Sequence, residues 1–160
     1  MTALAYTVAF EGIEARIVEV QCAVTPGIPA FTIVGLADKA VSEARERVRS
    51  ALSALQIALP SKRITINLSP ADMPKIGSHF DLPIALALLA ALDIIPADDA
   101  ARTVALGELS LNGDLVAVVG ALPAAMAAAT EDRQLLCPHA CGAEAAWVGN
   151  ARVIAPRSLA

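Results

Sequence analysis

The residues best suited to chemistry in this sequence are basic side chains gathered in two neighbouring segments. Arg45 and Arg49 lie four residues apart in a segment with helical periodicity, so both project from one face of the predicted helix. Lys62, Arg63 and Lys75 follow around the next predicted strand and its loop. Cations grouped in this way can neutralise DNA phosphates or the carboxylates of a neighbouring subunit. These five residues are therefore the predicted nucleic-acid or subunit interface.

The same helix also fits an ordinary solvated surface. Arg47 lies four residues after Glu43, and Arg49 lies three residues after Glu46. Ion pairs at these spacings contribute only about 0.2–0.5 kcal/mol each. Arg47 projects from a different side of the helix than Arg45 and Arg49. The residue pattern alone leaves both interpretations open.

One short segment offers metal-ligand types. Cys137, His139 and Cys141 lie within five residues, and Cys22 is a conceivable fourth ligand. Structural zinc sites usually have paired ligands at more regular spacing, so a turn that holds two small apolar cysteines is the favoured interpretation. His79 is interpreted as a histidine of a surface loop. We therefore expect no metal site, and zinc binding stays an alternative.

Nucleotide hydrolysis would require a glycine-rich loop with a lysine followed by Ser or Thr. The three lysines, Lys39, Lys62 and Lys75, precede Ala, Arg and Ile. We therefore expect no nucleotide cofactor in these residues.

Composition sets the class of protein. The chain has 160 residues, of which 56% are hydrophobic and 18% charged, with a net charge of −4, which predicts one globular domain. The longest apolar run, Leu82–Leu92, is shorter than the roughly 18–20 residues of a membrane span. Three cysteines and no basic leader predict a cytoplasmic protein with no membrane contact.

Hydrophobic periodicity predicts the elements that position these side chains. The helix that begins at Asp38 has one apolar face, and the almost wholly apolar helix that begins at Asp81 should lie in the core, each capped by its aspartate. Asn112 and Gly113 predict a hairpin turn. The predicted class is α+β, a single domain with a mixed sheet and helices packed on one face. The predicted strands cover Tyr6–Phe10, Arg16–Cys22, Phe31–Val34, Ile64–Leu68, Val104–Leu111, Leu115–Val119, Gln134–Cys137 and Val153–Ile154. A further helix is predicted over Ala121–Glu131 and a helical turn over Gly142–Trp147.

Five sequence blocks resemble a known family. They are Phe31–Asp38, Glu43–Arg49, Arg63–Asp72, Gly77–Leu86 and Leu106–Gly113. Together, and in this order, they are similar to the N-terminal domain of magnesium-chelatase-like AAA+ proteins of the ComM/YifB type. The resemblance runs from about Ala5 to Pro156.

This resemblance implies a Lon-protease-like fold for residues 1–160, placed upstream of an AAA+ ATPase module. It implies that ATP and Mg bind to that module, which these residues do not include. Members that resemble ComM are hexameric DNA helicases that promote branch migration during natural transformation. A homohexamer and DNA are therefore the implied partners.

Kinship with Lon also raises the alternative of a Ser-Lys peptidase. In the stretch that resembles the peptidase motif, His79 stands where the serine would be, and Ser78 lies one residue early. Leu122 stands where the lysine would be. Lys75 shares a loop with Ser78, but an exposed lysine is protonated at neutral pH and is a poor base. The expectation is a scaffold with no catalytic residues.

Overall fold

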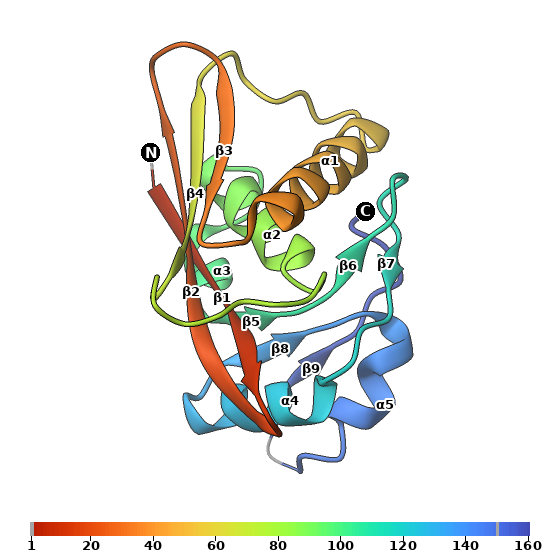
Figure 1. The fold of residues 1–160 in the computed structure, drawn as a ribbon. Helices are drawn as coiled ribbons and strands as arrows, with labels where there is room; N and C mark the ends of the chain where they lie inside the picture. The colour runs from red at the N-terminus through yellow and green to blue at the C-terminus, as the bar shows by residue number, and fades with distance from the viewer. Residues whose placement is uncertain (1, 150) are drawn as a thin grey trace.

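A seven-stranded mixed sheet runs through the computed structural model, which describes residues 2–149 and 151–160 (Figure 1). Its strand order is β3-β4-β2-β1-β5-β8-β9, and β6 and β7 form a separate hairpin. The strands are β1 (Thr2–Glu11), β2 (Glu14–Thr25), β3 (Ala30–Val34), β4 (Arg63–Ser69), β5 (Thr103–Ala105), β6 (Glu108–Leu109), β7 (Leu115–Val116), β8 (Gln134–Leu136) and β9 (Val153–Ile154). The helices are α1 (Asp38–Ala54), α2 (Asp81–Ala91), α3 (Ala97–Ala101), α4 (Ala121–Thr130) and α5 (Gly142–Ala145), with a 3-10 turn at His139–Cys141.

The sheet joins an antiparallel half to a parallel half. β1 and β2 form the expected antiparallel pair, in which Val8 is opposite Ile17, and β2 also pairs antiparallel with β4. β3 and β4 run parallel, as do β1 with β5, β5 with β8, and β8 with β9. The prediction of a mixed sheet in a single domain is confirmed.

Helices cover both faces of the sheet rather than one. Along β1, Ala5 and Ala9 belong to the core cluster that includes α1 and α2. The intervening Val8 belongs to a second cluster that includes α4 and α5. Because neighbouring strand residues point to opposite faces, α4 and α5 lie on the face opposite α1 and α2. The prediction that all helices pack on one face was wrong. Both sets of helices carry apolar faces, and hydrophobic periodicity does not specify which face of the sheet each helix covers.

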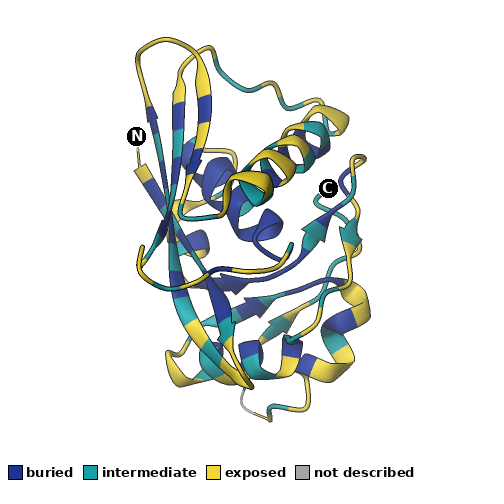
Figure 2. Cartoon of the chain, in the orientation of Figure 1, coloured by how far each residue is buried: buried dark blue, intermediate teal, exposed yellow. Residues whose placement is uncertain are grey.

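α2 is the central helix, as its composition predicts. It is buried over nearly its whole length, whereas α1 keeps an exposed outer side (Figure 2). The predicted caps at Asp38 and Asp81 were wrong, because the cap positions are Ala37 and Phe80 and neither makes a side-chain cap hydrogen bond. Each aspartate lies in the first turn instead, which leaves its carboxylate available for other partners.

The hairpin predicted at Asn112 and Gly113 is confirmed, with Gly113 at a φ of +93° between β6 and β7. The strand predicted over Val104–Leu111 divides into β5 and β6, and α3 was not predicted. No helix in the described ranges is both long enough and apolar enough to cross a membrane.

Thr7 carries an unsatisfied buried hydroxyl. Its side chain is fully buried, and within the described residues its Oγ1 has no hydrogen-bond partner. An orphaned buried polar group costs about 1–3 kcal/mol. Thr7→Val should therefore raise the free energy of unfolding, by about 1 kcal/mol, in urea denaturation.

Thr103→Val is the matched control for that substitution. Thr103 is also buried, but its Oγ1 donates to the Asp99 carbonyl at 2.7 Å and accepts from the Gln134 amide at 2.9 Å. This variant should lose about 1 kcal/mol. Equal losses in the two variants would show that the Thr7 hydroxyl has a bound partner.

Candidate nucleic-acid interface

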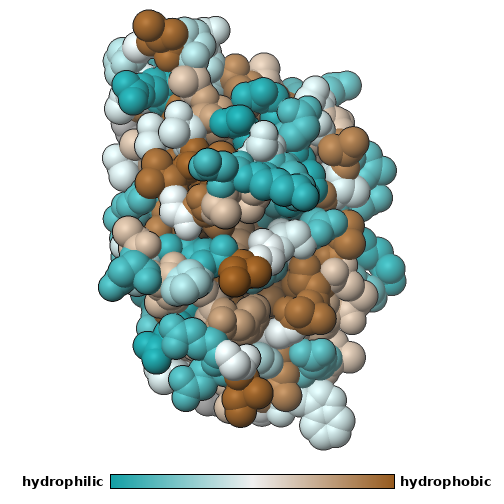
Figure 3. Space-filling model, viewed as in Figure 1, coloured by the Kyte–Doolittle hydropathy of each residue, from teal (hydrophilic) through white to brown (hydrophobic). Residues whose placement is uncertain are grey.

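Two of the five predicted basic residues converge on one hollow, and a third lies beside it. Arg49, from the second half of α1, and Lys62, from the loop before β4, line a hollow of about 280 Å³. Phe31, Leu59 and Pro60 supply apolar walls. Arg63 follows directly as the first residue of β4 and is exposed, with its side chain on the face of the sheet opposite Ile64, which lines the hollow. Hydrophilic side chains gather over α1 on the face shown in Figure 3.

Arg45 lies at the same end of the molecule but is partly committed to the fold. Its Nη1 donates to the carbonyl of Phe31 at 3.2 Å. Within the described residues β3 is an edge strand, paired with β4 alone, so the arginine satisfies a carbonyl that no further strand of the described sheet reaches. The Arg49 guanidinium lies 5.8 Å from the centroid of the Phe31 ring. Both arginines therefore pack around Phe31, and Arg49 is the more exposed.

Lys75 does not join this group. Its side chain is only 7% exposed, and Nζ donates to the carbonyls of Pro70 at 2.5 Å and Met73 at 2.9 Å. Desolvation lowers the pKa of Lys75. The expectation of an exposed lysine was wrong, because the loop after β4 folds back over the amine.

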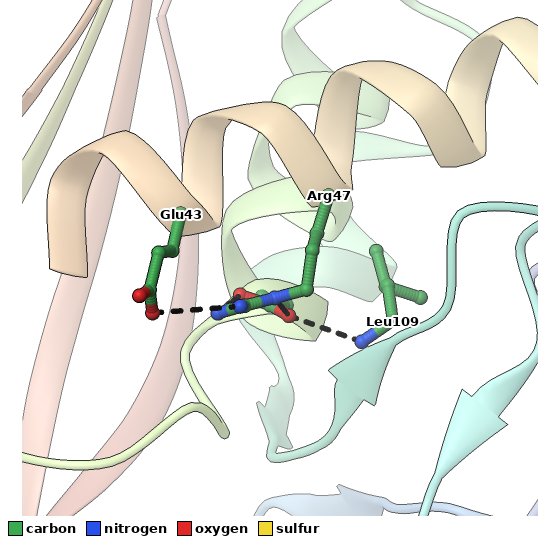
Figure 4. A network of polar contacts seen from close by, with 4 residues as sticks. Glu43, Arg47 and Leu109 are labelled. Atoms are coloured by element: carbon green, nitrogen blue, oxygen red, sulfur yellow. Dashed lines mark hydrogen bonds and ion pairs between the residues drawn. The ribbon is translucent and has the colours of Figure 1, made fainter. Parts of the chain in front are cut away.

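Arg47 forms a buried ion pair that sequence analysis missed. Its Nε and Nη2 donate to the two carboxylate oxygens of Asp81 at 2.5 and 3.2 Å. Glu43 lies 3.8 Å from Arg47 Nη1, as its spacing predicts, and the Leu109 N–H donates to Asp81 at 3.1 Å. Figure 4 shows Arg47 reaching from α1 between Glu43 and the Leu109 amide. The sequence carried one signal for this pair. Asp81 is an isolated acidic residue at the start of an apolar helix, and a buried carboxylate needs a partner.

This pair ties α1 to two neighbouring elements. It links α1 to the start of α2 and, through the Leu109 N–H, to β6. At about 100° per residue, Arg45 and Arg49 each lie about 200° around the helix from Arg47. Because Arg47 lies on the flank of α1 that faces the start of α2, Arg45 and Arg49 lie on the opposite flank, toward β3. Arg47 is therefore a positioning residue for the basic face.

The Asp81 carboxyl should also make stability depend on pH. The side chain is 0% exposed, and burial raises its pKa from 3.8 to about 6, with Arg47 and the Leu109 N–H acting in the opposite direction. A raised folded-state pKa means that the folded protein binds this proton more tightly than the unfolded chain does. The resulting stabilisation is complete below about pH 4 and is lost as the pH rises through about 6.

Asp81→Asn removes the titrating group and serves as the reference. In urea denaturation at each pH, the free energy of unfolding of the original chain relative to this variant should fall by about 2–3 kcal/mol from pH 4 to 7. A relative stability that rises with pH would show instead that the pKa of Asp81 in the folded protein lies below its value in the unfolded chain.

The region that resembles the peptidase motif is filled by aromatic side chains. His79 is only 4% exposed, with Nε2 2.7 Å from the Val8 carbonyl and its ring packed against Phe10 and Phe80 at centroid distances of 5.3 and 4.1 Å. Burial lowers the pKa of His79, although the bond to Val8 opposes this. The prediction of a surface histidine was wrong. A Cβ built on Gly120 would lie 2.3 Å from the Phe10 ring, so Phe10 occupies the space between His79 and Gly120.

The cysteine and histidine side chains do not assemble as ligands. Cys22 packs in the cluster with α1 and α2, whereas Cys137 and Cys141 pack in the cluster on the other face. Burial raises the pKa of Cys137 to about 11, which favours the thiol. His139 contacts the Ala155 carbonyl through Nδ1 and the Arg157 guanidinium through Nε2. In the described part of the chain, no three His, Cys, Asp or Glu side chains are grouped as a metal ion would require.

The motif blocks and the fold are those of the magnesium-chelatase-related class of proteins. Residues 18–141 match the family described as subunit ChlI of Mg-chelatase, and the chain belongs to that family. The ComM/YifB resemblance is confirmed by particular relatives. The chain is 43% identical over 148 residues to competence protein ComM of Haemophilus influenzae, covering 92% of this chain and 29% of that protein.

Two further relatives are named uncharacterized protein YifB. The Salmonella typhimurium protein is 40% identical over 148 residues (92% of this chain, 29% of that protein). The Escherichia coli protein is 42% identical over 133 residues (83% of this chain, 26% of that protein). The chain therefore spans less than a third of the length of these relatives.

Proposed function

We propose that this chain is the Lon-like N-terminal domain, residues 1–160, of a cytoplasmic AAA+ ATPase of the ComM/YifB type. In this proposal the domain has no peptidase activity, supports assembly of a hexamer and contacts the DNA that the ATPase moves. ATP and Mg bind to the downstream module, and the whole protein acts as a branch-migration helicase in natural transformation. Membership of the ChlI family and the identity to a protein named for competence support this assignment.

The observation that carries the DNA contact is a set of cations without acidic partners. Elsewhere on the surface, four arginines pair with carboxylates: Arg16 with Glu11, Arg102 with Asp99, Arg133 with Glu131, and Arg152 with Asp132. Among the described residues, no carboxylate forms an ion pair with Arg49, Lys62 or Arg63, and the same holds for Lys39 and Arg157, which do not line the hollow. Arg49, Lys62 and Arg63, grouped on one end of the molecule, remain available to phosphates, even though the chain as a whole is acidic.

Salt dependence of binding tests this contact. If Arg49, Lys62 and Arg63 each neutralise one phosphate, a plot of log affinity against log salt for duplex DNA should have a slope of about −2.7. Arg49→Gln with Lys62→Gln should reduce the slope to about −0.9, measured by fluorescence anisotropy. The matched control, Arg102→Gln with Arg152→Gln, removes two cations that already have acidic partners and should leave the slope unchanged. An unchanged slope in the first variant would refute the contact.

Assembly is tested on the full-length ATPase. Sedimentation velocity with and without residues 1–160 should show loss or weakening of the hexamer on deletion. Unchanged ring formation would refute the scaffold role. It would leave the DNA contact as a separate proposal.

The absence of peptidase activity is supported by the geometry around Phe10. The residue in the serine position is the buried His79, and the Lys75 amine is held by two backbone carbonyls. Casein digestion by the chain should equal that of a Ser78→Ala variant, with both at background. Cleavage that Ser78→Ala abolishes would establish the peptidase instead.

A further inference from the structure

We propose that the hollow beside Arg49 and Lys62 receives one unstacked base of single-stranded DNA, while neighbouring phosphates contact the cations at its rim. This inference rests on the proposed DNA contact and adds to it which form of DNA is bound. It concerns the space between the start of β3, the second half of α1 and the loop before β4.

The hollow has the size and lining for one flat apolar group. Its volume of about 280 Å³ is at the lower limit of the ~300–1,000 Å³ range of small-molecule sites. Phe31 and Ile64 are buried at its base, and Pro29, Leu59 and Pro60 line it further. None of its lining residues is acidic. A ligand that fits must combine an apolar surface with adjacent negative charge, and a nucleotide does so.

Arg49 gives the hollow a preference for a planar ligand. Its guanidinium lies within 5.8 Å of the Phe31 ring centroid and lines the hollow. The planar guanidinium group of arginine can stack on a nucleobase and can also pair with phosphate. The lysine ammonium group interacts with phosphate only as a point charge. Lys62 lines the hollow, and Arg63, the next residue, carries positive charge from the same end of β4 to the opposite face of the sheet. Charge that continues around the end of the molecule suits a linear polyanion better than a single carboxylate.

The walls are held in place by the fold. The Lys62 N–H donates to the Pro60 carbonyl at 2.8 Å, and the Ala30 N–H donates to the Lys62 carbonyl at 3.4 Å. The bond from Arg45 to Phe31 holds the edge of β3 against α1. Such a preformed site lowers the ordering entropy that binding must overcome.

A base can enter this hollow only when it is not stacked within a duplex. Single-stranded DNA should therefore bind more tightly than duplex DNA, and part of its affinity should come from the bases. Stacking of one base contributes the equivalent of roughly a fivefold or greater change in affinity.

The test compares three fluorescein-labelled probes by anisotropy with the 160-residue chain: oligo(dT) of about 20 nucleotides, an abasic oligonucleotide of the same length, and a duplex of the same length. The abasic probe carries the same phosphates without bases. Ser61→Phe fills the hollow from the loop and keeps every cation. Thr32→Phe is the control, since it adds the same side chain on the face of β3 that points away from Phe31 and the hollow. Pro60→Phe also fills the hollow and covers the case in which Ser61→Phe does not fold.

We expect oligo(dT) to bind at least fivefold more tightly than the abasic probe. Ser61→Phe should remove that difference without weakening abasic binding, and Thr32→Phe should preserve it. Equal binding of oligo(dT) and the abasic probe would overturn the base site and leave the phosphate contact intact. Binding of none of the probes at low salt would overturn the proposed DNA contact as well. Binding of an oligoglutamate peptide alone would identify an acidic protein as the partner and also overturn the inference.

Discussion

Replacing Arg47 by methionine should lower the free energy of unfolding by about 3–5 kcal/mol. The substitution keeps a long apolar side chain but leaves Asp81, which is 0% exposed, as a buried carboxylate without its cation. The Leu109 N–H and Asp81 would remain bonded, so the expected loss reflects the unpaired charge, or the proton that Asp81 binds in its place because its pKa is already raised to about 6. Urea denaturation at about pH 9, where the carboxyl of the unfolded chain is ionised and proton uptake on folding costs most, measures it. No other single change in the charged residues should have so large an effect.

Two comparisons separate charge from packing in that experiment. Arg102→Met breaks a pair of similar N–O distance, 2.7 Å to Asp99, but both of those side chains are more than half exposed, so the loss should stay within about 0.5 kcal/mol. Arg47→Met combined with Asp81→Asn removes both charges and keeps an oxygen for the Leu109 N–H. This double variant should regain about 2 kcal/mol or more of the single variant's loss. If it is no more stable than Arg47→Met, the buried charge is not the cause.

Gly35→Ala should destabilise the chain by about 2–5 kcal/mol, from backbone strain and overpacking together. Gly35 follows β3 with a φ of +111°, a conformation that side chains with a Cβ rarely adopt. A Cβ there would lie 2.7 Å from the Leu68 carbonyl oxygen and 2.9 Å from the Leu68 Cβ. These atoms belong to β4 and cannot move aside as the end of a flexible side chain can. Thermal or urea unfolding measures the loss.

Gly12→Ala isolates the contribution of backbone conformation. Gly12 has a φ of +61° in the β1–β2 turn, and nothing lies within 4 Å of the position of an added Cβ. This variant should lose about 1–2 kcal/mol, the cost of the left-handed conformation alone. Equal losses at Gly12 and Gly35 would mean that the close approach to β4 contributes nothing.

Both predictions of a large loss of stability concern residues that hold the basic residues of α1 in position. The Arg47–Asp81 pair ties α1 to α2 and β6, and the Gly35 turn brings the end of β3 close to β4 before the chain enters α1. Milder variants at these positions that still fold should therefore alter the geometry of the hollow, whereas the Thr7 and Thr103 variants should alter stability alone.

Much of the secondary structure was predictable because it depends on residues close together in the chain. The alternation of Ile64, Ile66 and Leu68 identified the buried side of β4, and the spacing of Ala44, Val48 and Leu52 identified the inner face of α1. The same local rules failed at helix starts. Asp38 and Asp81 have the residue type of a cap, but the cap positions are Ala37 and Phe80, one residue earlier.

The candidate interface was only partly predictable. Arg49, Lys62 and Arg63 stood out as a group of cations, but whether each has a neutralising partner depends on what folds against it. Lys75 has the same residue type and is buried, because the loop that contains it turns back on its amine. His79 is buried for a related reason, since β1 supplies the carbonyl and the aromatic ring that surround it.

By itself, the sequence determined the hydrophobic faces, the hairpin turn, the family and the basic residues from which an interface can be built. Only the tertiary structure decided that helices cover both faces of the sheet, that Arg47 faces Asp81, and that Arg49 lines a hollow. The physical reason is separation along the chain. Arg47 and Asp81 are 34 residues apart, and a contact between them depends on how α1 packs against α2, which neither local propensity nor periodicity specifies.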